Sequence, residues 1–192
     1  LEVPWDYSTP HGTFGLYARE IIPPGGEDLP ALLYLQGGPG FPAPRPLAPT
    51  GLIGKALERY RVILMDQRGT GRSHRIDALS PAAERTATHL ALLRQDNIVR
   101  DAERLREHLG LEKWSLFGQS FGGFCITAYL SQAPERVEHA FFTGGIPTLK
   151  GADDLYRATF SKLKARQQRF YREFAWAQGR IEEIISHLDN SD

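Results

Sequence analysis

The feature that most constrains the fold is a glycine-flanked serine that lies between a short apolar run and a longer one. The first run has the length and composition of a buried strand, and the second has apolar residues at helical spacing. Residues 118–122 between them are Gly-Gln-Ser-Phe-Gly, which fits the pattern Gly-x-Ser-x-Gly. A chain that turns so sharply from strand to helix leaves no room for side chains at Gly118 and Gly122 and exposes Ser120 at the tip. We therefore predict a nucleophile elbow with Ser120 as the catalytic nucleophile.

A simpler interpretation of Ser120 is that it only begins the helix, because serine is a common N-cap residue and the pattern also occurs by chance. The strand, turn and helix around it favour the catalytic interpretation. Unpaired N–H groups and the dipole at a helix start favour negative charge, and an oxyanion forms during acyl transfer. Two motifs upstream of the serine point the same way.

The first of these motifs is a glycine cluster. Residues 31–35 form a continuous apolar run, which predicts a strand buried on both faces, and Gln-Gly-Gly-Pro-Gly follows directly at residues 36–40. A phosphate-binding loop is excluded because no Gly-Lys-Ser/Thr follows. An ordinary turn-rich loop remains the alternative. We favour an oxyanion loop, in which glycines let backbone N–H groups approach a substrate carbonyl.

The second motif follows another buried run, at residues 61–65. Residues 66–73 are Asp-Gln-Arg-Gly-Thr-Gly-Arg-Ser, a composition similar to that of a phosphate cradle. No helical pattern follows, however, and no acidic residue stands at the spacing of a dinucleotide site. We therefore predict a structural turn, with Asp66 and Arg68 as members of a buried ion pair that orders it.

The remaining pattern indicates the fold class. Residues 13–21 predict a strand with one side exposed to solvent, which pairs with the stretch before His11. Two helices are predicted over residues 51–60 and 96–108, and a further strand over residues 137–143. Alternating strands and helices across residues 31–144 predict an α/β fold, with a mainly parallel sheet and helices on both faces. The sequences of residues 153–174 and 179–188 predict two amphipathic helices. These helices either serve only for packing or begin a lid over the elbow.

Composition and charge limit the partners. Lys and Arg total 23, as do Asp and Glu, so no net field attracts nucleic acid, and no apolar run approaches the ~20 residues of a membrane span. The one cysteine, Cys125, cannot form an internal disulfide and is expected as a small buried hydrophobe. No signal peptide is recognised, and a cytoplasmic location is expected. No histidine pair stands at ligand spacing, so neither a metal nor a cofactor is expected.

The three motifs together resemble one family. Residues 36–40, 66–73 and 118–123, in that order, and the segment 101–110, are similar to the proline iminopeptidases (prolyl aminopeptidases), serine peptidases of the α/β-hydrolase fold. The likeness covers nearly the whole chain. Many members have histidine where this chain has Gln36. The variant with glutamine is similar to the branch with the larger lid, and this difference leaves the glycine amides in place.

The resemblance implies both an architecture and an activity. Residues 1–148 would be the N-terminal part of an α/β-hydrolase core, and residues 149–192 the start of a helical cap, with the rest of the cap and the C-terminal core strands absent. The implied activity is release of an N-terminal residue, preferentially proline, from a small peptide whose N-terminal proline is free. Ser120 would form the acyl-enzyme, and the backbone amides of Gly38 and Phe121 would form the oxyanion hole. No metal or cofactor is implied.

The catalytic acid and base are expected outside this chain. In this fold the order along the chain is Ser, then Asp or Glu, then His. Downstream of Ser120 the histidines are His139, inside a predicted strand, and His187, on a predicted lid helix. Both ends of the chain look cut, and we expect the acid and base beyond Asp192. The segment by itself is therefore predicted to be inactive.

Two alternatives remain open at this point. A serine esterase or lactonase would share every motif used above, and it would differ in not requiring a free N-terminal amine. A hydrolase-like module without catalytic activity is favoured only if the full gene also lacks the distal Asp and His. The sequence makes no prediction of oligomeric state.

Overall fold

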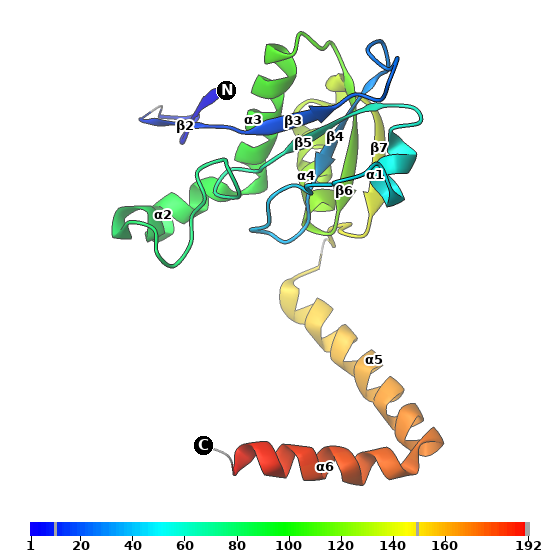
Figure 1. Cartoon of the computed structure of the whole chain (residues 1–192). Helices are drawn as coiled ribbons and strands as arrows, with labels where there is room; N and C mark the ends of the chain where they lie inside the picture. The colour runs from blue at the N-terminus through cyan, green and yellow to red at the C-terminus, as the bar shows by residue number, and fades with distance from the viewer. Residues whose placement is uncertain (10, 149, 191–192) are drawn as a thin grey trace. The chain divides into compact units, whose positions relative to one another are not determined.

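The computed structural model describes residues 1–9, 11–148 and 150–190, and Figure 1 shows it as a ribbon. The chain divides into two compact units, Leu1–Pro147 and Thr148–Asp192. The first unit holds the sheet and the predicted elbow. The second holds the two predicted C-terminal helices, and each unit is described by itself.

Among the described residues, five strands form one sheet in the order β3-β5-β4-β6-β7. The strands are β3 (Ala18–Ile21), β4 (Ala31–Leu35), β5 (Arg61–Met65), β6 (Trp114–Gln119) and β7 (Val137–Thr143). Neighbours among β4 to β7 pair in parallel, and only β3 runs antiparallel, at its pairing with β5. The predicted, mainly parallel sheet is therefore confirmed. The central strand β4 is buried along its whole length, as its continuous apolar sequence predicts.

The predicted strand over residues 13–21 is divided in two. β2 (Thr13–Gly15) pairs with β1 (Glu2–Pro4), the stretch before His11, whereas β3 joins the large sheet. The division falls at Tyr17, whose N–H donates to Ser73 Oγ at 2.8 Å and whose carbonyl accepts from the Asp66 N–H at 3.0 Å. These bonds take the backbone groups that a continuous ladder would use. The single-strand prediction was therefore wrong, although its pairing with the N-terminal stretch is confirmed.

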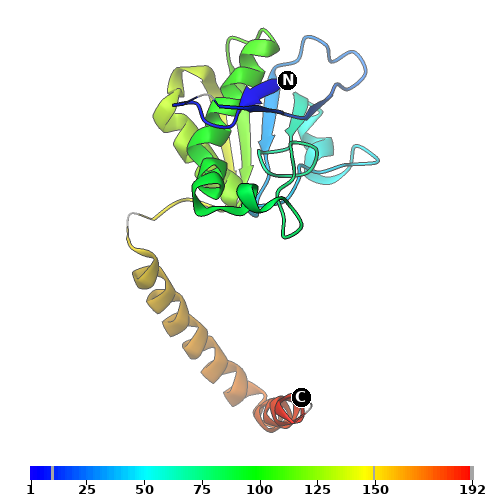
Figure 2. The same ribbon diagram turned by 90° about the vertical axis from the view of Figure 1, so that its left-hand side faces the viewer.

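Helices cover both faces of the sheet, as Figures 1 and 2 show. Helices α3 (Gln95–His108) and α4 (Phe121–Gln132) pack on one face, where Leu33 and Leu35 enter the larger apolar cluster. Helix α1 (Gly51–Ala56) packs on the other face through Ile53, beside Leu32 and Tyr34. Alternate residues of β4 therefore enter different cores, as the strand period requires. The shorter helices are η1 (Ala82–Arg85), α2 (Ala87–Leu90), η2 (Ala91–Leu93) and η3 (Pro134–Arg136).

A buried polar network joins α3 and α4 to β6. The indole N–H of Trp114 donates to the Tyr129 hydroxyl at 3.0 Å, and that hydroxyl donates to Glu103, which pairs with Arg106 at 2.8 Å. Burial and then the Glu103 carboxylate raise the pKa of Tyr129, so the phenol stays protonated and remains a donor. The helix that follows Ser120 is thereby fixed against both β6 and α3.

The second unit consists of α5 (Ala152–Glu173) and α6 (Ala175–Asp189). The predicted start of the second helix at Gly179 was late, because the chain resumes a helix directly after Phe174. Apolar side chains of this unit, such as Leu155, Phe160 and Trp176, are exposed. No helix among the described residues is long and apolar enough to cross a membrane.

Candidate active site

The turn from β6 into α4 presents Ser120. Its φ is +51°, a left-handed backbone conformation that is strained for a residue with a side chain, and the side chain is exposed. A Cβ at Gly118 would lie 2.5 Å from the carbonyl oxygen of Gly122, and a Cβ at Gly122 would lie 2.0 Å from that of Leu35. The glycines are thus needed for the close approach of strand, turn and helix, which is the reason predicted from the sequence.

A further glycine, Gly145 in the loop after β7, packs against the elbow. The Ser120 N–H donates to the carbonyl oxygen of Thr143 at 3.2 Å. Gly145 has φ of +72°, and a Cβ there would lie 1.6 Å from the carbonyl oxygen of Ser120. The role of Gly145 depends on its contact with Ser120, which lies more than twenty residues earlier in the chain, so no local pattern reveals it.

The glycine loop at residues 36–40 lies directly against the elbow. A Cβ at Gly37 would be 2.8 Å from the carbonyl oxygen of Gln119 and 3.1 Å from Ser120 Cβ. The ends of β4 and β6 are also joined by the Tyr34 hydroxyl, which donates to Gln119 Oε1 at 2.9 Å. Burial raises the pKa of Tyr34, so this donor stays protonated.

Both predicted oxyanion donors lie at this junction. Gly38 has φ of +127°, and its N–H donates to no described residue. Phe121 is the first residue of α4, where an amide has no partner within the helix. The structure therefore brings the loop of Gly38 and the start of α4 together beside Ser120.

Comparison with known proteins identifies the fold family. A profile of the alpha/beta hydrolase fold matches residues 30–184. The chain belongs to the α/β-hydrolase fold family. The fold is also similar to that of a solved structure, a 2-hydroxy-6-oxo-6-phenylhexa-2,4-dienoate hydrolase from Rhodococcus sp. strain RHA1. That match has a TM-score of 0.53 and 24% identity, and it covers 78% of this chain and 47% of the other.

Within the α/β hydrolases, sequence similarity supports the family resemblance drawn from the motifs. The chain is 43% identical over 201 residues to a proline iminopeptidase of Aeromonas sobria, covering 99% of this chain and 47% of that protein. It is 37% identical to a proline iminopeptidase of Aspergillus aculeatus, covering 98% of this chain and 45% of the other. The resemblance to the proline iminopeptidase family is thus confirmed. The chain spans about half the length of the curated relatives it matches.

The predicted ion pair of the turn after β5 needs correction. Asp66 and Arg68 are both buried, but they do not pair with each other. The Asp66 carboxylate accepts hydrogen bonds from Arg45 and from the backbone N–H groups of Ala43 and Arg72. It therefore ties the proline-rich segment after the glycine loop to the turn. Arg68 contacts a different set of neighbours, on α3 and near the N-terminus.

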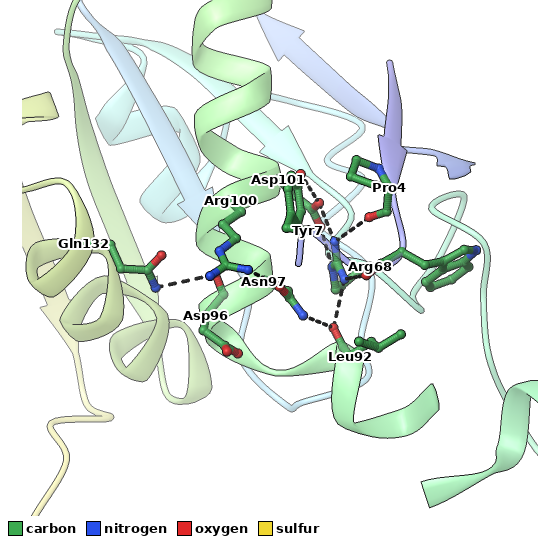
Figure 3. A network of polar contacts seen from close by, with 10 residues as sticks. Pro4, Tyr7, Arg68, Leu92, Asp96, Asn97, Arg100, Asp101 and Gln132 are labelled. Carbon is green, nitrogen blue, oxygen red and sulfur yellow. Dashed lines mark hydrogen bonds and ion pairs between the residues drawn. The ribbon is translucent and has the colours of Figure 1, made fainter. Parts of the chain in front are cut away.

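Arg68 is the centre of the network in Figure 3. Its side chain is fully buried and binds Asp101 through Nε and Nη2, each at 2.7 Å, while the Tyr7 hydroxyl donates to the same carboxylate at 2.9 Å. Its other hydrogen bonds reach the carbonyl oxygens of Pro4, Trp5 and Leu92. All five donors of the guanidinium are used. Arg68 in this α/β hydrolase is therefore a structural hub, and its role is not proton transfer.

A hollow of about 370 Å³ lies beside the glycine loop. It is lined by the glycine loop, the turn after β5 with Ile76 beyond it, the short helices α2 and η2, the start of α3 and the first residue of α4. The lining residues are Pro39, Gly40, Gln67, Arg68, Gly69, Thr70, Ile76, Leu90, Leu93, Arg94, Gln95, Ile98 and Phe121. No sequence pattern predicted this hollow, because its walls come from separate segments.

Among the described residues of the first unit, no side chain is placed as a base for Ser120. Ser120 Oγ makes no hydrogen bond to a described residue. His139 lies early in β7, beside Phe141 and level with the first residues of β6, whereas Ser120 follows the end of β6. Cys125 is fully buried on α4, where burial raises its thiol pKa to about 12. Neither side chain is placed to activate Ser120.

Proposed function

We propose that this chain is the front part of a serine aminopeptidase that releases an N-terminal residue, preferentially proline, from small peptides. The observation that carries the proposal is the junction at Ser120. An exposed serine in a strained backbone conformation stands between the amide-rich glycine loop and the start of α4. The similarity to proline iminopeptidases over almost the whole chain supports the substrate class.

The proposed reaction uses these groups in two steps. Ser120 Oγ attacks the carbonyl carbon of the N-terminal residue and gives its proton to the base, while the carbonyl oxygen accepts hydrogen bonds from the N–H groups of Gly38 and Phe121. The C–N bond then breaks as the base returns the proton to the leaving amine. Water hydrolyses the Ser120 ester in the second step, releasing the N-terminal amino acid and restoring the hydroxyl.

We propose that the acid and the base are supplied by polypeptide beyond Asp192. No described histidine of the first unit makes a hydrogen bond with Ser120 Oγ, and the relatives are about twice as long as this chain. Residues 149–192 would then begin the cap domain of that longer protein. The experiments below use the longer protein that carries this chain, except where the segment is named.

The decisive test is labelling with a fluorophosphonate probe, combined with the hydrolysis of a prolyl arylamide. The unsubstituted protein should carry one adduct, on Ser120. Ser120→Ala should abolish the adduct and lower kcat/KM by roughly 10⁴-fold or more, since the covalent route is lost. The matched control is Ser131→Ala, because Ser131 lies exposed at the other end of the same helix.

Three results would contradict the proposal. Hydrolysis by Ser120→Ala at an undiminished rate would exclude Ser120 as the nucleophile. Equal cleavage of prolyl and N-acetylprolyl arylamides would favour an esterase or lactonase, because an aminopeptidase requires the free amine. A longer protein that neither takes up the probe nor cleaves the arylamide would be the non-catalytic module.

A further inference from the structure

The hollow beside the glycine loop adjoins both proposed oxyanion donors. Pro39 and Gly40 directly follow Gly38, and Phe121 directly follows Ser120. Its walls are largely apolar, with Leu93 and Ile98 among them. A substrate whose carbonyl is held at the two amides would therefore place one of its neighbouring groups in this hollow.

The hollow carries a positive charge that no acidic side chain of its described lining neutralises. Arg94 lines it and is exposed, and its side chain makes no hydrogen bond or ion pair with any described residue. The other lining cation, Arg68, is neutralised by Asp101. None of the described residues that line the hollow is acidic, and Asp96, on the first turn of α3, lies outside its walls. An anionic group is thus favoured beside the glycine loop.

We infer that this hollow binds the residue after the scissile bond, and that Arg94 pairs with that residue's C-terminal carboxylate. The inference rests on the proposed function. The other end of the substrate carries a cationic amine, which Arg94 would repel, so the leaving-group end is the one that fits. An extended residue spans about 3.3–3.6 Å. The C-terminal carboxylate of a dipeptide therefore lies at the hollow, whereas the carboxylate of a longer peptide lies beyond it. The preferred substrate class is therefore prolyl dipeptides with an apolar second residue.

The experiment compares proline release from Pro-Leu and from Pro-Leu amide, which lacks the carboxylate. The unsubstituted protein should favour Pro-Leu, and Arg94→Gln should raise KM for Pro-Leu about tenfold, because a charge-assisted hydrogen bond is lost. KM for the amide should not change. A second comparison should favour Pro-Leu over Pro-Gly by about tenfold in kcat/KM, because the leucine side chain is buried.

Arg104→Gln is the matched control. Arg104 lies on α3, is exposed like Arg94, pairs with Glu107 and does not line the hollow. Arg94 precedes α3 without a side-chain capping bond, so its replacement should leave the helix intact. Arg104→Gln should cleave both Pro-Leu and a prolyl arylamide as the unsubstituted protein does.

The outcomes separate this inference from the proposed function. Cleavage of the arylamide without any preference for the free carboxylate would overturn the inference and leave the function standing. An equal effect of Arg94→Gln and Arg104→Gln on Pro-Leu would also overturn it. Failure of the unsubstituted protein to cleave arylamide or dipeptide would overturn the proposed function, and the inference with it.

Discussion

The glycines around Ser120 are set by contacts with backbone atoms rather than by local turn preference. At Gly122 an added Cβ would lie 2.0 Å from the Leu35 carbonyl oxygen, and at Gly37 it would lie 2.8 Å from that of Gln119. Backbone atoms cannot rotate away as a flexible side chain can. A methyl group at either position must therefore move β4 relative to the elbow, and the proposed oxyanion hole with it.

We expect Gly122→Ala to destabilise the protein by at least about 2 kcal/mol, because the overpacking is against backbone. Activity on a prolyl arylamide should fall further than the loss of folded protein explains. Gly15→Ala is the control, since its Cβ would lie 3.4 Å from the flexible Glu2 side chain. Urea denaturation measures both free energies of unfolding, and equal values would contradict the argument.

At the scale of elements, the orientation of α4 depends on a buried polar network and not on apolar packing only. The Tyr129 hydroxyl accepts from the indole of Trp114 on β6 and donates to Glu103 on α3. One side chain of α4 therefore fixes the helix against the strand that precedes Ser120 and the helix beside it. Loss of the hydroxyl would leave a buried indole N–H without its partner.

Tyr129→Phe should lower the free energy of unfolding by about 1–3 kcal/mol, the usual penalty for an unsatisfied buried polar group. Tyr156→Phe should change it little, because the Tyr156 side chain is exposed. Chemical denaturation of the two variants beside the unsubstituted protein measures the difference. A Tyr129→Phe protein as stable as Tyr156→Phe would show that apolar packing is sufficient to hold α4.

At the scale of the whole molecule, the chain carries one part of the proposed machinery. The proposed nucleophile and the proposed oxyanion donors lie in the unit Leu1–Pro147, and we propose that the base comes from polypeptide beyond Asp192. The exposed apolar residues of α5 and α6 agree with the proposal that these helices begin a larger cap domain. The nucleophile and oxyanion donors would then come from one half of the longer protein, and the acid and base from the other half.

The purified 192-residue segment should hydrolyse no prolyl arylamide above background, whereas the longer protein should hydrolyse it. Without its base a serine hydrolase retains at best about 10³–10⁴-fold over water, and only if the oxyanion hole and binding site are intact. Measurable turnover by the segment, abolished by Ser120→Ala, would show that its own residues supply the base.

Local sequence determined the elements and the position of the elbow. The strands β4, β5 and β6 and the helix α4 were predicted because apolar periodicity and glycine placement are properties of neighbouring residues. Only the tertiary structure decided what depends on residues far apart. It paired Arg68 with Asp101, divided residues 13–21 between two sheets and set Gly145 against Ser120. It also formed the hollow of Arg94 from separate segments, since no local pattern encodes which loops meet at the edge of a sheet.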